Sequence, residues 1–219
     1  YQQKNQRIVY KKIENKGIAA NTNAAETLAT GEYLALADHD DVLAPHAMYA
    51  MGKAVLQLRE KGEPDGFLYS DEALFTKDIK KPMVGHFKPD YAPDYLLCCN
   101  YICHLAVFKR ALYEQLGGER PECDGSQDHD LFLRLIEQVG GAAHVPHTRT
   151  WASKTEHQTN AQSVLPEAGK RLCAFFCMFG THSSSGRCRS TKWFLRKVSS
   201  PSSRIRHSSL ERALRSRLR

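Results

Sequence analysis

The chain contains a short apolar run that ends abruptly in acidic residues, and this junction limits its possible folds more than any other feature. The run Tyr33-Leu34-Ala35-Leu36-Ala37 has the length and composition of a buried strand, and Asp38-His39-Asp40-Asp41 follows it directly. Carboxylates gathered at one strand end repel one another unless a cation lies between them. Hard divalent cations prefer oxygen ligands and often leave positions open for phosphate oxygens. The Asp-x-Asp pattern therefore indicates a site for a metal ion and a diphosphate.

The same acidic residues also allow a plainer interpretation. Asp41 stands shortly before Pro45, and an acidic residue followed by proline is typical of the amino end of a helix. The cluster would then be a solvated loop that caps the helix and binds no ligand. The Asp-x-Asp pattern alone does not separate these interpretations, and only the residues around it favour the metal site.

Segments of strand character alternate with segments of helical character along most of the chain. Helical periodicity is clearest in residues 45–61, where Met48, Met51, Val55 and Leu58 share one face. The expected strands are residues 7–12, 33–37, 66–70 and 101–108, and the expected helices are residues 18–29, 45–61, 110–116 and 128–139. This order predicts an α/β fold with a mostly parallel sheet flanked by helices, and ligands at the carboxyl ends of its strands.

One region between these elements lacks a clear pattern. Residues 71–100 are rich in proline and lysine and show neither a helical nor a strand period. We expect a loop region that faces the substrate, because loops on a rigid scaffold commonly carry binding residues.

Charge divides the chain into a body and a tail. Residues 181–219 hold eleven Lys and Arg against one acid, a charge of +10, so residues 1–180 carry −3 of the total of +7. We expect residues 1–170 to form one domain and residues 171–219 to be a basic Ser- and Arg-rich tail, either disordered or foreign to the domain. Such a tail can also lie on an anionic membrane surface, whereas nucleic acid is a less favoured partner.

The sequence contains no signal for secretion and no span of apolar residues long enough to cross a membrane. The first six residues are polar, and the apolar stretch of residues 95–108 is interrupted by Asn100 and His104. An odd count of seven cysteines without a Cys-x-x-Cys pair favours reduced thiols, with Cys98, Cys99 and Cys103 as small core residues. We therefore expect a cytoplasmic protein, which the tail can hold at the inner face of the cell membrane.

Further motifs stand in a fixed order on both sides of the acidic cluster. They are Arg7-Ile8-Val9-Tyr10, Asn15-Lys16-Gly17 through Asn21, Gly31-Glu32-Tyr33, Tyr69-Ser70-Asp71-Glu72, Phe87-Lys88-Pro89-Asp90, Asn100-Tyr101-Ile102 and Gly125-Ser126-Gln127-Asp128-His129-Asp130-Leu131. In this order and spacing, residues 7–147 resemble the bacterial family-2 glycosyltransferases that build O-antigen and other surface polysaccharides. The resemblance implies a GT-A-like (Rossmann-like) fold, a nucleotide-sugar donor, a glycan or lipid-linked glycan acceptor, and a divalent metal, Mn²⁺ or Mg²⁺.

The resemblance also implies roles for individual residues. Asp128 would be the catalytic base that takes the proton of the acceptor hydroxyl in an inverting transfer. The implied metal ligands are Asp38, Asp40 and Asp41, and the implied substrate-binding residues are Asn15, Asn21, Asp38, Asp71 and Gln127. Several have structural alternatives that stay open. Asp128 can simply complement a helix amino end, Asp71 and Asn15 can be turn residues, and Asn21 can be only a helix residue.

Two departures from the family pattern shape the remaining expectations. The family begins with an apolar strand before the equivalent of Arg7, so we expect a partial catalytic domain with a sheet that is incomplete at the amino end. His144 and His147 lie where a family histidine sometimes completes the metal shell, but the sequence around Trp151 differs from the family pattern. An inactive remnant of such an enzyme, or a binding module that acts through its basic tail, are therefore alternatives to an active transferase.

Overall fold

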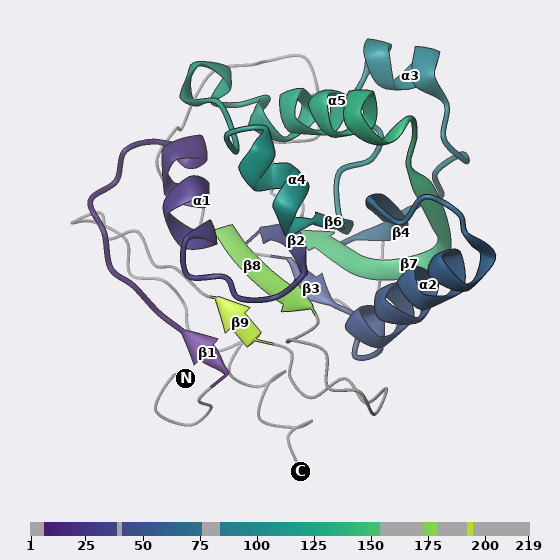
Figure 1. Cartoon of the computed structure of the whole chain (residues 1–219), viewed down its shortest axis with the longest axis horizontal. Coiled ribbons are helices and arrows are strands. Elements are labelled where there is room, and N and C mark those ends of the chain that lie inside the picture. Colours follow the sequence, from purple (N-terminus) through teal and green to yellow (C-terminus); the bar gives the residue numbers. More distant parts are fainter. Residues whose placement is uncertain (1–6, 39–40, 76–83, 154–172, 179–191, 195–219) are drawn as a thin grey trace.

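The structure is a computed structural model that describes residues 7–38, 41–75, 84–153, 173–178 and 192–194. The helices are α1 (Ile18–Glu26), α2 (Ala47–Lys61), α3 (Pro93–Cys98), α4 (Arg110–Gln115) and α5 (Gln127–Val139), with a 3-10 turn, η2 (Pro121–Cys123). The strands are β1 (Ile8–Val9), β2 (Tyr33–Asp38), β3 (Val42–Leu43), β4 (Phe67–Phe75), β5 (Val84–His86), β6 (Ala106–Lys109), β7 (Ala143–Ser153), β8 (Cys173–Met178) and β9 (Lys192–Phe194). Figure 1 shows the sheet at the centre with helices around it.

Within the described residues the strands form one mixed sheet. Its order is β1-β9-β8-β2-β6-β4-β7-β3, and β5 pairs with β4 outside this row. Only the pairs β1–β9 and β4–β7 are parallel, and the other six pairs are antiparallel. The prediction of an α/β fold is confirmed, but the prediction of a mostly parallel sheet is wrong.

The insertion of β6 explains this difference. β2, β4 and β7 all run in one direction, as expected of strands joined through helices, but β6 lies between β2 and β4 and runs against both. An alternating pattern of strands and helices suggests the direction of successive crossovers, but it does not tell whether a later strand will enter between two earlier ones. As a result, the parallel strands β2 and β4 are not neighbours.

The antiparallel direction of β6 positions the candidate site. Leu36 and Tyr69 both pair with Ala106, so the start of β6 lies near the carboxyl end of β2 and beside the third residue of β4. The backbone N–H of Ser70 also donates to Leu105, which extends the β4 side of this register by one residue. Polar residues just before β6 are thereby brought to the same edge as the acidic residues that end β2.

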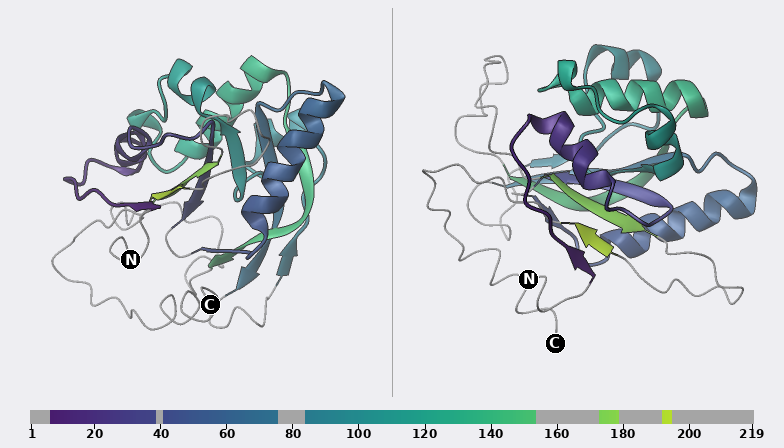
Figure 2. Two further views of the ribbon diagram at one scale, coloured as in Figure 1. Left: turned by 60° about the horizontal axis from the view of Figure 1, so that its bottom comes forward. Right: turned by 60° about the vertical axis from the view of Figure 1, so that its left-hand side comes forward.

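Both faces of the sheet are covered by helices, as the two views of Figure 2 show. Leu34 and Leu36 of β2 belong to a core cluster that includes residues of α1, α3, α4 and α5. Tyr33, Ala35 and Ala37 point to the opposite cluster, which is closed by Ala47, Met51 and Val55 of α2. This alternation along β2 follows from the two-residue period of a strand and explains why the run is apolar on both sides.

The predicted helices agree well with the structure. Met51 and Val55 are buried and Met48 and Leu58 pack beside them, as the periodicity of residues 45–61 predicts. The expected loop of residues 71–100 instead contains the end of β4, the short strand β5 and the helix α3, and the long strand β7 was not predicted. The core prediction for the cysteines is also wrong, because Cys98 and Cys99 are exposed and Cys103 is half-buried; these thiols and Cys123 are free.

Residues after position 170 contribute strands to the sheet. β8 pairs with β2 over six residue pairs from Tyr33–Met178 to Asp38–Cys173. Most of residues 171–219 lies outside the described residues, so the division at residue 170 stays a prediction. No helix within the described ranges has the length and apolar character needed to cross a membrane.

Candidate active site

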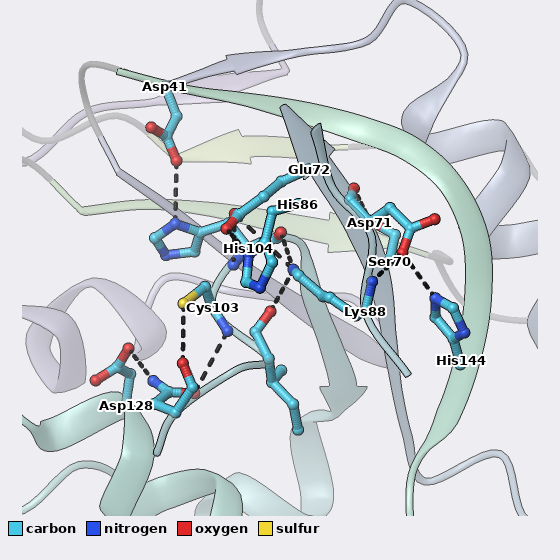
Figure 3. A network of polar contacts seen from close by, with 12 residues as sticks. Asp41, Ser70, Asp71, Glu72, His86, Lys88, Cys103, His104, Asp128 and His144 are labelled. Atoms are coloured by element: carbon cyan, nitrogen blue, oxygen red, sulfur yellow. Dashed lines mark hydrogen bonds and ion pairs between the residues drawn. The ribbon is translucent and has the colours of Figure 1, made fainter. Parts of the chain in front are cut away.

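The acidic end of β2 is joined to a histidine from the segment before β6. Asp41 lies 3.0 Å from Nδ1 of His104, and both side chains are largely buried (Figure 3). Burial alone would lower the pKa of His104, but the bond to Asp41 and the charges of Asp38, Asp41 and Glu72 raise it to about 9. The imidazole therefore carries a positive charge at neutral pH, held by the negative charge of the acidic cluster.

The acidic cluster brings two of the described carboxylate residues close together. Asp38 and Asp41 are kept close by a turn in which the Asp41 N–H donates to the Asp38 carbonyl over 3.2 Å. Carboxylate oxygens suit a hard divalent ion such as Mn²⁺ or Mg²⁺. Among the described residues, no group of three or more His, Cys, Asp or Glu side chains is arranged to hold a metal, and Asp40 lies outside them. The metal-binding role of Asp38, Asp40 and Asp41 stays a prediction.

Asp128 stands in the first turn of α5 with a defined orientation. The side-chain amide of Asn100 donates to Asp128 Oδ2 over 2.8 Å, and the backbone N–H of His129 donates to Oδ1 over 2.9 Å. The neighbouring Gln127 is largely buried, and its Oε1 accepts the N–H of Gly125 over 2.8 Å. Asp128 is half-buried, which leaves part of its surface open to an acceptor.

One short stretch of chain connects Asp128 with the acidic cluster. We call residues 100–104 the bridge segment, because Asn100 at one end contacts Asp128 and His104 at the other contacts Asp41. Within the segment, the Cys103 N–H donates to Asn100 Oδ1 over 3.4 Å and its thiol to the Asn100 carbonyl over 3.2 Å. The predicted base and Asp41, one of the predicted metal ligands, are therefore both in contact with this five-residue segment.

Asp71 lies on β4 with both carboxylate oxygens engaged. It accepts hydrogen bonds from the Lys88 N–H (2.9 Å), His144 Nε2 (2.9 Å) and the His147 N–H (2.7 Å). Burial would raise the pKa of Asp71, but these donors together lower it. The carboxylate thus links β7 to β4 through hydrogen bonds. A contact between Asp71 and substrate stays a prediction. His144 also stacks on Tyr69, with ring centroids 5.1 Å apart.

Glu72 and Lys88 form a buried polar pair beneath the bridge segment that sequence analysis missed. Glu72 accepts from the His104 N–H over 3.3 Å, meets His86 Nδ1 at 2.8 Å and lies 3.9 Å from Lys88 Nζ. Burial lowers the pKa of Lys88, and the charge of Glu72 opposes this effect. Both residues stand in the motifs of the family resemblance, but their spacing along the chain does not indicate that they face each other.

Asn15 and Asn21 meet at the amino end of α1. The Asn21 amide donates to Asn15 Oδ1 over 2.7 Å, and the Lys16 N–H donates to Asn21 Oδ1 over 3.1 Å. The structure therefore brings these two predicted residues together, while their contact with a nucleotide stays a prediction. Asp124 caps the same helix end, since its carboxylate accepts the N–H groups of Ile18 (3.1 Å) and Ala19 (2.8 Å).

Glu119 is a second acidic residue near Asp128 that the sequence did not reveal. Only 3% of its surface is exposed, and its Oε2 has no hydrogen-bond partner among the described residues. Burial and the charge of Asp128, with smaller contributions from Asp124 and Asp38, raise the pKa of Glu119 to about 8. Glu119 is therefore largely protonated at neutral pH and adds little negative charge to the site.

Comparison with known proteins decides the family. The profile described as Glycosyl transferase family 2 matches residues 1–117, more than half of the 219 residues. The chain belongs to glycosyl transferase family 2. Membership confirms the resemblance seen in the sequence and makes this chain a family-2 glycosyltransferase domain with a GT-A-like α/β architecture.

Three known proteins have sequences similar to this family-2 domain. It is 37% identical over 134 residues to the uncharacterized protein y4gI of Sinorhizobium fredii, and 30% identical over 157 residues to the O-antigen biosynthesis protein RfbC of Myxococcus xanthus. It is 27% identical over 141 residues to a chondroitin synthase of Pasteurella multocida. These matches cover 61%, 70% and 64% of the chain but only 14%, 12% and 14% of the relatives. The chain thus spans about an eighth of the length of these proteins.

Proposed function

We propose that this family-2 glycosyltransferase domain moves a sugar from a nucleoside-diphosphate sugar to a hydroxyl group of a growing glycan during surface-polysaccharide synthesis. The observation that supports this most directly is the bridge segment, which holds Asp41 at one end and Asp128 at the other. A transfer needs a charged site for the donor diphosphate and a base for the acceptor, and the two carboxylates that would supply them contact the two ends of this one segment. The printed names of the relatives, O-antigen biosynthesis protein and chondroitin synthase, support a polysaccharide product.

The donor half of the site is built from the acidic end of β2. A divalent metal bound by Asp38, Asp40 and Asp41 would supply positive charge to stabilise the negative charge that develops on the leaving diphosphate. Asp38 also faces the ribose and sugar of the donor in this proposal. His104 keeps Asp41 in place through an ion pair of 3.0 Å.

The acceptor half depends on Asp128. Its carboxylate takes the proton of the acceptor hydroxyl while the hydroxyl oxygen forms the new bond to the anomeric carbon and the bond to the diphosphate breaks. Attack from the face opposite the leaving group inverts the configuration of that carbon. Asn100 holds the carboxylate in one orientation through its 2.8 Å bond, so a lone pair can stay directed at the acceptor.

The remaining predicted residues complete the proposed pocket. Asn15 and Asn21, which meet beside α1, shape the nucleotide pocket, and Gln127 stands next to the base. Asp71 contributes through the strand that carries it, since its carboxylate already accepts three hydrogen bonds. The acceptor is a glycan or a lipid-linked glycan, and the basic residues 181–219 would favour attachment at an anionic membrane surface.

Nucleotide binding tests the proposal most directly. Calorimetric titration of the chain with UDP, GDP, CDP and dTDP, each with Mn²⁺ and with EDTA, should reveal one nucleotide that binds only with the metal. The variant D40N should lose that binding by roughly tenfold or more, because a direct metal ligand is removed. E63Q is a matched control, since Glu63 is an exposed acidic residue just after α2.

Each outcome separates the candidate functions. Binding that is unchanged in D40N would exclude the metal role of the acidic cluster. A chain that binds none of the nucleotides in the presence of Mn²⁺ or Mg²⁺ would instead be an inactive remnant. Salt-sensitive binding to anionic vesicles or nucleic acid that disappears on removing residues 181–219 would point to the tail as the working part.

A further inference from the structure

Lys88 lies at the centre of the polar network beneath the bridge segment, and the proposed reaction does not use it. Its side chain is fully buried. Lys88 Nζ donates to the carbonyl oxygens of Ile102 (2.5 Å) and His104 (2.7 Å), as Figure 3 shows. A buried ammonium is strongly unfavourable unless its donors are satisfied, so these two carbonyls and Glu72 at 3.9 Å are what permit the charge to remain there.

The same lysine is attached to β4 through its backbone. The Lys88 N–H donates to Asp71 over 2.9 Å, and Glu72 beside the ammonium is the next residue of that strand. β6 begins only at Ala106, and its pairing with β4 reaches no further than the bond between Ser70 and Leu105. The bridge segment therefore lies beyond the strand ladder, and Lys88 and Glu72 connect it to β4.

We propose that Lys88 is a positioning residue that fixes the bridge segment for both halves of the reaction. Its ammonium binds the segment at Ile102 and His104. This holds His104 against Asp41 at one end of the segment and Asn100 against Asp128 at the other end. Lys88 itself touches neither donor nor acceptor in this arrangement. The catalytic consequence rests on the proposed function, whereas the structural consequence can be measured without it.

Cys103 offers a probe inside the bridge segment. Burial and the charge of Glu72 raise the pKa of the Cys103 thiol to about 12, whereas the charge of Lys88 acts to lower it. Alkylation by N-ethylmaleimide, followed at each cysteine by mass spectrometry, reports how accessible this thiol is. Cys123 in η2 serves as an internal reference because it is also half-buried.

The variant K88M keeps the length of the side chain and removes the ammonium. If Lys88 holds the segment, alkylation of Cys103 should become roughly tenfold faster relative to Cys123, because local opening exposes the thiol. If Lys88 contributes only charge, its removal disfavours the thiolate, and alkylation stays equal or becomes slower. That second result would overturn the proposal. K109M is the control, since Lys109 of β6 is also ion-paired, 2.5 Å from Asp65, but away from the segment.

Turnover gives the second measurement. K88M should lower kcat for sugar transfer by about 10²-fold, the scale of a 1 Å misplacement of catalytic groups, with a smaller change in KM for the donor. A folded K88M with wild-type kcat and wild-type labelling of Cys103 would refute the positioning role. If K88M does not fold, the variant E72Q/K88M removes the buried carboxylate that has lost its partner, and E72Q alone becomes the reference.

The two proposals fail in different ways. If the wild-type chain binds no nucleotide and transfers no sugar, the proposed function is wrong, yet the labelling of Cys103 still decides the role of Lys88. If the wild-type chain is active and K88M changes neither kcat nor labelling, only the positioning role is wrong.

Discussion

The side-chain amide of Asn100 donates a 2.8 Å hydrogen bond to the carboxylate of Asp128, and so links the segment after α3 to the first turn of α5. Among the described residues, the half-buried Asp128 accepts only one other hydrogen bond, from its own neighbour His129, so Asn100 sets its orientation. We expect N100L to lower kcat on the order of tenfold to a hundredfold, since the base would lose its alignment. Steady-state transfer assays with a fixed acceptor measure this.

Nucleotide binding provides the control for N100L. Metal-dependent affinity for the nucleoside diphosphate should stay within a factor of about two, an effect below 0.5 kcal/mol. A variant that binds nucleotide normally and turns over at the wild-type rate would contradict the orienting role of Asn100.

Replacing Gly17 should destabilise the amino end of α1. Gly17 has φ +98°, and a Cβ at this position would collide with the Asp124 carboxylate that caps the helix. G17A is therefore expected to lower the free energy of unfolding by roughly 2–4 kcal/mol, from backbone strain and a lost cap together. Chemical denaturation measures the change.

Gly62 is the matched control for Gly17. It has φ +69° at the end of α2, and nothing lies within 4 Å of its added Cβ. G62A should then lower the free energy of unfolding only by the cost of placing alanine in the left-handed conformation, about 1–2 kcal/mol. Equal effects of G17A and G62A would show that the contact with Asp124 contributes nothing.

The buried carboxyl of Glu119 should make stability fall with rising pH. Its pKa is raised from 4.5 in the unfolded chain to about 8 in the fold, so its contribution is complete below pH 4.5 and is lost as the pH rises through 8. E119Q should remove this dependence. In the wild-type chain it amounts to on the order of 1.4 kcal/mol of unfolding free energy per pH unit between the two pKa values. Denaturation curves from pH 5 to 8 test it, and E122Q, at an exposed position three residues later, should keep the wild-type slope.

Asp71 should show the opposite pH dependence. Its pKa is lowered below 3.8 in the fold, so its stabilisation is present at neutral pH and is lost as the pH falls through the folded pKa. D71N is expected to lower the free energy of unfolding by about 1–3 kcal/mol at neutral pH, because a buried hydrogen-bonding network is left incomplete. The difference from wild type should shrink in acid. A D71N chain with unchanged stability and weaker donor binding would favour direct substrate contact instead.

Local patterns in the sequence predicted the elements that pack by a simple period. In β2, α2 and α5, the spacing of the apolar residues along the chain predicts which side chains are buried. These side chains lie in the core clusters as that spacing predicts. β7 was missed because it includes His144, Pro146 and His147, which obscure any alternation. α3 was missed because it is only six residues long and lies in a proline-rich stretch.

The candidate site likewise has residues that the sequence predicts and residues that it does not. Asp38 and Asp128 could be proposed because each stands at the end of an element that the sequence reveals. The contacts of Asn100, Lys88 and His104 could not be predicted, since they depend on β6 entering between β2 and β4. Asp124 is similar, because the helix that it caps begins 106 residues earlier in the chain.

The place of β6 between β2 and β4 matters while the chain is being synthesised. β2 and β4 leave the ribosome before β6, and neither can pair with β6 until the 34 residues from Thr76 to Lys109 have followed. At about 5–20 residues per second, this takes roughly 2–7 s, during which two apolar strands have unpaired edges. Nascent chains that stop before β6 should therefore be the species that aggregate or require a chaperone.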